Sequence, residues 1–184
     1  MSYTKNEIEK VYTLTPMQEG MLFASLNQDI HKYDYYVSLD FDYIGEFNVE
    51  SFKYALNSLI HNHDILRTVF DYSKLEKIVQ IVLKDVETDI EVYDIKKLSN
   101  SQKNKQIEGL MNKDKIKYFD FNKGPLFRAK VFLCDDDSTK IILIFHHIII
   151  DGWCLSALIK ELFNYYYGKP VKKNKIEFED YVKH

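Results

Sequence analysis

The feature that most constrains the fold is a run of apolar residues at 141–150, interrupted only by His146 and His147. Successive side chains of a strand point to opposite faces of a sheet, so an apolar residue at every position predicts a strand buried on both faces. We therefore expect the strand over 140–147 to lie in the centre of a sheet. The run is too short to span a bilayer.

Helices and strands are predicted in mixed order along the rest of the chain. Thr15, Pro16 and Gln18 supply a capping hydroxyl, a proline at the first helical position and a capping-box glutamine. This cap predicts a helix over 16–27, and apolar periodicity predicts helices from Asn48 onward and from 152 to 168. A further, polar and Lys-rich helix is predicted over 101–118. Alternation and apolar runs predict strands over 35–43, 66–72, 77–83, 90–93, 127–134 and 140–147. Together they predict an α/β fold, a two-layer sandwich in which helices cover one mixed sheet.

Length, charge and cysteine content limit the classes of function. The 184 residues correspond to about one domain. A formal net charge of −3 gives no electrostatic argument for nucleic acid as a partner. The two cysteines, Cys134 and Cys154, make neither a disulfide framework nor a four-ligand zinc site. The polar start lacks the apolar core of a secretory signal, and no segment predicts membrane insertion, so we expect a cytoplasmic protein.

The adjacent histidines are the strongest candidates for chemistry. Strand alternation predicts that His147 shares a face with Leu143 and Phe145, while His146 points to the other side. Two core histidines with satisfied hydrogen bonds would explain the pair without any function. Opposite faces make shared metal ligation difficult, and no metal is expected. A Cys154 nucleophile paired with His147 is also possible.

Three more residues are candidates for the same site. Asp151 separates the strand from the next helix, where its carboxylate can accept backbone N–H bonds or pair with an arginine. Gly152 allows a close backbone approach. Arg67 begins another apolar strand and needs a carboxylate partner if it is buried, although a surface position would explain it equally well.

Three segments resemble the motifs of the condensation domains of non-ribosomal peptide synthetases. Residues 146–152 read HHIIIDG and match the HHxxxDG motif of that family. Residues 14–23, LTPMQEGMLF, resemble its first motif, and residues 63–70, HDILRTVF, resemble its second, HExLRTxF, with Asp64 in place of Glu. The resemblance implies a chloramphenicol-acetyltransferase-like fold of two similar lobes with the active site between them.

The resemblance covers the N-terminal lobe only. We therefore expect residues 1–184 to be the N-terminal subdomain of a condensation domain, without its C-terminal subdomain. The implied reaction is amide formation between an acyl or peptidyl thioester and the amine of an aminoacyl thioester. Upstream and downstream carrier domains would hold both substrates on phosphopantetheine arms, and this chain itself would bind no cofactor. The missing C-terminal lobe is a further expected partner, and the surface it would cover predicts self-association.

By the same resemblance, His147 is the central catalytic residue, with Asp151 and Gly152 beside it in the motif. Whether His147 removes a proton or positions the amine stays open at this point. His146 and Arg67 are expected to support the site. We expect Arg67 to form an ion pair with Asp151 that holds the loop after the histidine strand.

Related activities share parts of this pattern. Trp153, directly after Gly152, is expected to support the site, and its place favours condensation over epimerisation domains, in which the tryptophan usually comes later. Heterocyclisation domains replace both histidines with an aspartate-based motif. A free-standing acyltransferase of the same superfamily stays possible, as does a lobe that docks carrier proteins without activity of its own. Asn62 and Cys154 stand where Arg and Ser are common, and neither change touches the proposed chemistry.

Overall fold

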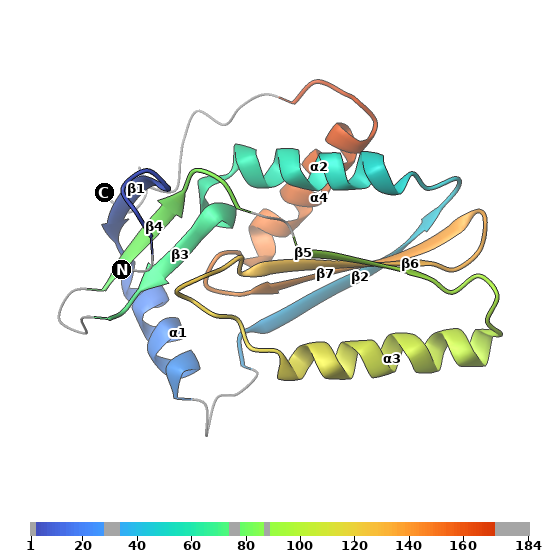
Figure 1. Cartoon of the computed structure of the whole chain (residues 1–184), viewed down its shortest axis with the longest axis horizontal. Helices are drawn as coiled ribbons and strands as arrows, with labels where there is room; N and C mark the ends of the chain where they lie inside the picture. The colour runs from blue at the N-terminus through green and yellow to red at the C-terminus, as the bar shows by residue number, and fades with distance from the viewer. Residues whose placement is uncertain (1–2, 28–33, 74–77, 87–88, 172–184) are drawn as a thin grey trace.

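The computed structural model describes residues 3–27, 34–73, 78–86 and 89–171. They form a four-stranded sheet of order β2-β7-β6-β5 and a three-stranded sheet of order β1-β4-β3 (Figure 1). The strands are β1 (Ile8–Thr13), β2 (Tyr36–Ile44), β3 (Thr68–Asp71), β4 (Val79–Leu83), β5 (Asp89–Asp94), β6 (Phe127–Leu133) and β7 (Ser138–His146). The helices are α1 (Pro16–Leu26), α2 (Val49–Asn62), the 3-10 turn η1 (Asp64–Arg67), α3 (Asn100–Ile116) and α4 (Gly152–Tyr166).

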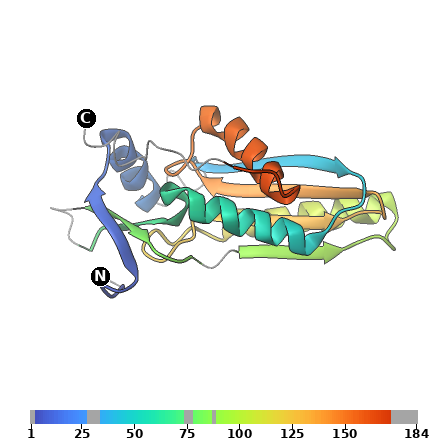
Figure 2. The same ribbon diagram turned by 90° about the horizontal axis from the view of Figure 1, so that it is seen from above.

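The expected α/β class and mixed sheet are confirmed. In the large sheet, β7 runs antiparallel to β2 and β6, and β5 runs parallel to β6. Helices α2 and α4 lie side by side over one face of this sheet, whereas α3 lies on the other (Figures 1 and 2). The single expected sheet is divided in two, because β1 pairs with β4 and places the β3–β4 hairpin in a sheet of its own.

Strand β7 has the central position that its apolar run predicts. Ile141, Leu143 and Phe145 pack into the larger core beneath α2 and α4. Ile142 and Ile144 pack into a second core beneath α3. All five side chains are at least 96% buried, as alternation in a doubly covered strand requires.

Two elements differ from the sequence pattern. The sequence of β1, IEKVYT, intersperses charged residues with apolar ones and gives no clear strand signal, so its pairing with β4 is what makes it a strand. The strand expected over 66–72 begins only at Thr68, because η1 occupies Asp64–Arg67 and bonds the Thr68 hydroxyl to the Asp64 carbonyl. Lys77, expected at the start of the next strand, lies outside the described residues.

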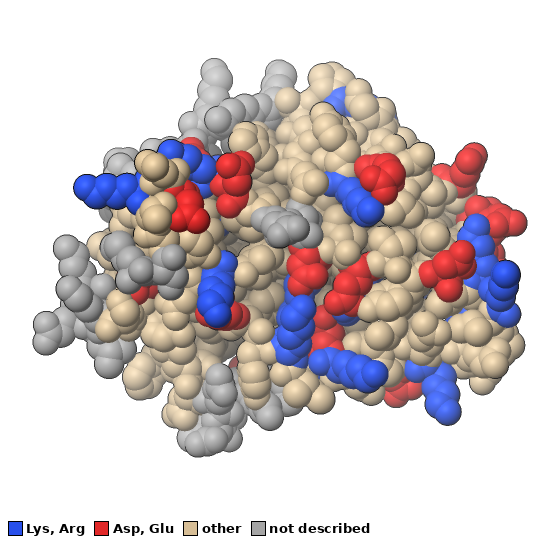
Figure 3. Space-filling model, viewed as in Figure 1, with Lys and Arg blue, Asp and Glu red and all other residues tan. Residues whose placement is uncertain are grey.

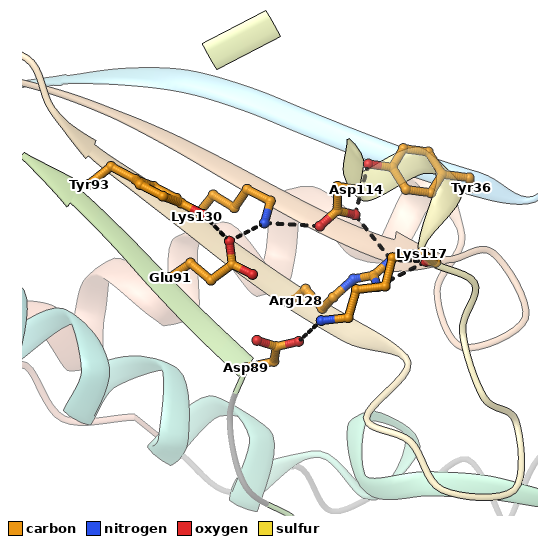
Figure 4. Close-up of polar contacts among 8 residues, drawn as sticks. All are labelled: Tyr36, Asp89, Glu91, Tyr93, Asp114, Lys117, Arg128 and Lys130. Atoms are coloured by element: carbon orange, nitrogen blue, oxygen red, sulfur yellow. Dashed lines mark hydrogen bonds and ion pairs between the residues drawn. The ribbon is translucent and has the colours of Figure 1, made fainter. Parts of the chain in front are cut away.

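Helix α3 is held to the large sheet by buried charges. Asp114, on α3, lies 3.1 Å from the guanidinium of Arg128 and 3.0 Å from the ammonium of Lys130, both on β6 (Figure 4). Lys130 also lies 2.5 Å from Glu91 on β5, and Tyr36 on β2 donates to Asp114 at 3.3 Å. The cluster thus joins α3 to three strands, a role that its polar sequence did not predict.

The surface carries mixed charge. On the face seen in Figure 3, acidic and basic side chains are interspersed, in line with the small net charge. Among the described residues, no helix combines the length and hydropathy that crossing a membrane requires.

Candidate active site

His147 lies where the central strand gives way to a loop. Strand β7 ends at His146, and residues 146–150 form two overlapping turns before α4 begins. In these turns the Ile149 N–H donates to the His146 carbonyl at 3.2 Å, and the Ile150 N–H donates to the His147 carbonyl at 3.3 Å. The His147 N–H donates to the carbonyl of Tyr35, next to β2, at 2.9 Å. The sheet therefore fixes the backbone at which the loop starts.

His146 is a buried histidine with both ring nitrogens engaged. Its side of the strand is closed by Phe121, whose ring meets the imidazole edge-on at 4.8 Å between centroids. The Ser25 hydroxyl lies 3.1 Å from Nε2, and the Ile148 N–H donates to Nδ1 at 3.1 Å. Burial, with a smaller effect of His147, lowers the pKa of His146 to about 4. His146 is therefore neutral near pH 7, which suits the supporting role expected of it.

The imidazole of His147 differs from that of His146 in its hydrogen bonding. The residue is half-buried, and its Nδ1 is buried without a hydrogen-bond partner among the described residues. Buried polar atoms nearly always have a partner, so an unpartnered ring nitrogen at a motif position points to function. Of the two histidines, only His147 has a buried ring nitrogen without a hydrogen-bond partner among the described residues.

Asp151 caps helix α4. Its carboxylate accepts the Cys154 N–H at 2.8 Å, as an N-cap aspartate does. These hydrogen bonds hold the pKa of Asp151 below its ordinary value. The carboxylate thereby fixes the junction between the His147 loop and α4.

The predicted ion pair between Arg67 and Asp151 is wrong. The Arg67 guanidinium contacts Asp64 at 2.6 Å, Glu9 at 2.6 Å and the Leu83 carbonyl. Arg67 lies at the end of η1 against the small sheet, where these acceptors surround it, and it is only 4% exposed. It therefore joins η1 to β1 and β4 and does not contact the loop after His147.

The start of α4 is open to solvent. Trp153 is 91% exposed, and an added Cβ at Gly152 would meet no atom within 4 Å. On α1, Met17 and Phe23 are also exposed, at 72% and 75%. Partial burial and the nearby Asp151 carboxylate raise the pKa of the Cys154 thiol, which disfavours the thiolate that a nucleophile needs.

A pair of buried glutamines lies beside the loop, and sequence reasoning missed it. Gln18 and Gln80 are 4% and 0% exposed, and Gln18 Nε2 lies 3.4 Å from the Ile148 carbonyl. The sequence pattern identified Gln18 as part of a helix cap and of the segment 14–23 that resembles the first motif, and gave it no contact with the loop. The usable signal was Gln80, the single polar residue of the otherwise apolar strand β4.

The chain belongs to the condensation-domain family, whose family model matches residues 8–184. Surfactin synthase subunit 2 of Bacillus subtilis (strain 168) is 35% identical over 185 residues, covering 98% of this chain and 5% of that protein. Tyrocidine synthase 2 of Brevibacillus parabrevis is 34% identical over 164 residues, which are 89% of this chain and 4% of that protein. The chain thus spans only a small part of these curated relatives.

Solved structures confirm the fold. The starter condensation domain of rhizomide synthetase superposes with a TM-score of 0.81 at 18% sequence identity. The match covers 95% of this chain and 44% of that one. The described residues thus have the condensation-domain fold over less than half the length of that solved chain.

Proposed function

We propose that residues 1–184 are the N-terminal half of a peptide-synthetase condensation domain that forms an amide bond once a C-terminal half is present. The observation that carries this is the half-buried imidazole of His147, just after β7 in the HHxxxDG motif of a family member, whose Nδ1 has no hydrogen-bond partner among the described residues. The match to less than half of a solved condensation domain supports the assignment to one half.

The proposed reaction joins two thioesters held on the phosphopantetheine arms of carrier domains. The amine of an aminoacyl thioester attacks the carbonyl carbon of an acyl or peptidyl thioester. A C–N bond forms, the C–S bond breaks, and the thiolate leaves with the donor arm and is protonated. The amine loses one proton in this step. Both arms belong to partner domains, and this chain holds no cofactor of its own.

We propose that His147 acts on the amine. Its Nδ1 is buried, so we infer that a substrate meets the ring from the side of Nε2. Neutral imidazole can accept a hydrogen bond from the amine, which aligns its lone pair with the carbonyl, or it can take up the amine proton as the C–N bond forms. Aminolysis of a thioester is downhill, and we propose that alignment of the amine with the carbonyl supplies part of the acceleration.

The remaining motif residues take supporting parts. Asp151 caps α4 and holds the end of the loop, a change from its expected pairing with Arg67. Nothing in the described chain fills the space beside Gly152. We propose that a substrate arm or the C-terminal half approaches the backbone at this glycine. Arg67 secures η1 on the small sheet.

A second function is that of a lobe that docks carrier domains and is inactive alone. Its support is the exposure of Trp153, Met17 and Phe23. Clusters of exposed large apolar side chains often mark a surface that a partner covers. Trp153 is the single tryptophan of the chain, so its fluorescence reports on this surface. We expect acrylamide to quench it strongly in the chain alone and weakly when a carrier domain is bound.

The test is an amide-forming assay with two loaded carrier domains. It compares the chain alone, the chain joined to a C-terminal condensation half, and the joined form with His147→Ala. Product from the joined, unmutated form only would support a catalytic half whose site needs both lobes. Product at equal rates with and without His147 would leave the docking lobe as the better description.

A further inference from the structure

We propose that helix α1 positions the catalytic loop, with Ser25 and Gln18 as positioning residues for His147. The inference rests on the proposed function, because it assigns these side chains to the same site. Neither Ser25 nor Gln18 is proposed to touch the substrates. They act through Ile148, the residue after His147, whose two peptide groups are both held by side chains (α1 lies beside the left end of the large sheet in Figure 1).

The first contact begins at Ser25. Its hydroxyl donates to the Met21 carbonyl at 2.7 Å, so towards His146 Nε2, at 3.1 Å, its oxygen acts as the acceptor. Nε2 then carries the ring proton and Nδ1 has a free lone pair. That lone pair accepts the Ile148 N–H at 3.1 Å. Ser25 thus selects the tautomer that can hold the loop.

The second contact begins at Gln18. Its Nε2 lies 3.4 Å from the Ile148 carbonyl and 3.3 Å from Gln80 Oε1. Gln80 Nε2 donates in return to Gln18 Oε1 at 3.1 Å and to the Thr13 carbonyl at 2.8 Å, while the Thr15 N–H donates to Gln18 Oε1 at 3.0 Å. Because both amides are buried, water does not compete for these bonds.

The two contacts fix the residues on both sides of His147. Ser25 holds the ring of His146, and Gln18 holds the carbonyl of Ile148. The direction of the His147 side chain therefore depends on α1. The core contacts of β7 and α4 do not involve these bonds. Loss of one bond should therefore loosen the loop, leave the fold intact, and lower the turnover rate more than substrate affinity.

The main test is Ser25→Ala in the chain joined to a C-terminal condensation half. We expect kcat for amide formation to fall about tenfold and KM for the aminoacyl carrier to change less than about twofold. Ser25→Thr keeps a hydroxyl that can bond both Met21 and His146, and it should retain kcat within about twofold. Ser101→Ala, an exposed serine on α3, is the matched control and should leave both constants unchanged.

A second measurement reads the contact without any chemistry. In the chain alone, Ser25→Ala should raise the hydrogen-exchange rate of the Ile148 amide about three- to tenfold, because His146 loses the hydrogen bond that favours the tautomer accepting this amide. The amides of Ile142 and Leu143 in β7 should keep their rates. Gln18→Met, which keeps the side-chain length without a donor, should also lower kcat about tenfold. If that variant fails to fold, the serine variants still decide the matter.

Wild-type kcat in Ser25→Ala would overturn the proposal, whether or not the Ile148 amide exchanges faster. A tenfold loss that Ser25→Thr does not restore would also overturn it, since the hydroxyl would then not be the cause. Full activity of His147→Ala is a distinct result. It would remove the proposed function, while the exchange of the Ile148 amide would still report on the contact.

Discussion

Asp114 on α3 and Arg128 on β6 form a buried ion pair at 3.1 Å, with side chains only 1% and 5% exposed. Lys130 lies on the other side of the same carboxylate at 3.0 Å. A pair of this kind gives little net stability, but removal of one partner leaves the remaining charges buried and uncompensated. Asp114 therefore holds α3 on the sheet chiefly because Arg128 and Lys130 require it.

Asp114→Asn is expected to lower the free energy of unfolding by about 3–5 kcal/mol, since it leaves the buried Arg128 guanidinium without a carboxylate and Lys130 with Glu91 alone. The measurement is urea unfolding of the chain followed by circular dichroism. Asp120→Asn removes the carboxylate from the exposed pair with Lys123 and should change the unfolding free energy by less than about 1 kcal/mol. Equal losses in the two variants would show that burial does not set the effect.

His146 should make stability depend on pH in acid. Its folded pKa of about 4 lies below the ordinary value of 6.5, so the unfolded state binds more protons between these values. The unfolding free energy should therefore fall as the pH decreases from about 6.5 to about 4, by roughly 3 kcal/mol in total from this residue. Above pH 7 the residue contributes no slope.

The check is the pH dependence of urea midpoints for the wild type and for His146→Asn, whose side-chain oxygen can replace Nδ1 as acceptor. The difference between the two curves isolates this residue from the carboxylates that titrate in the same range. His61→Asn, an exposed histidine on α2, serves as the control. A constant difference between wild type and His146→Asn across this pH window would contradict the account.

Arg67 and Asp151 should be energetically independent, because each has its own separate partners. A double-mutant cycle of Arg67→Gln and Asp151→Asn should give a coupling energy below about 0.5 kcal/mol. The same cycle with Asp64→Asn should give about 1–3 kcal/mol, since Asp64 contacts the buried guanidinium directly at 2.6 Å. A larger coupling energy of Arg67 with Asp151 than with Asp64 would contradict this account and support the Arg67–Asp151 ion pair expected from the resemblance.

Gly152→Ala should separate stability from activity. The residue begins α4, and an added methyl group meets nothing within 4 Å, so the chain should unfold at the same urea concentration or gain up to about 1 kcal/mol of stability. Condensation by the joined form should nevertheless slow by about tenfold or more if a substrate arm passes this glycine. Unchanged turnover would mean that the open space beside Gly152 is not part of the substrate path.

The sequence predicted the parts of the fold that depend on local pattern. The run over 141–150 placed β7 in the centre, and Thr15, Asn48 and Asp151 marked helix starts where the structure has them. It did not predict β1, whose strand depends on pairing with β4, or the buried charges of α3, which depend on facing strands. Such features come from tertiary contacts between segments distant in the chain.

The candidate site shows the same division. The motifs located His146, His147 and Asp151 at one loop, because they are adjacent in the sequence. The partner of Arg67 was predicted from a motif analogy and was wrong, since carboxylates from β1 and η1 lie nearer. The contacts of Ser25 and Gln18 with the loop involve sequence separations of 121 and 130 residues, which no local pattern encodes.

The most direct test of the central claim is the single-turnover rate of amide formation in the joined form with His147→Ala. If the imidazole aligns or deprotonates the amine, the rate constant should fall at least about 100-fold, with an unchanged circular dichroism spectrum. His61→Ala, the matched control on α2, should retain the wild-type rate. A His147→Ala rate within about threefold of wild type would contradict the account, because general acid–base or positioning groups contribute far more than that.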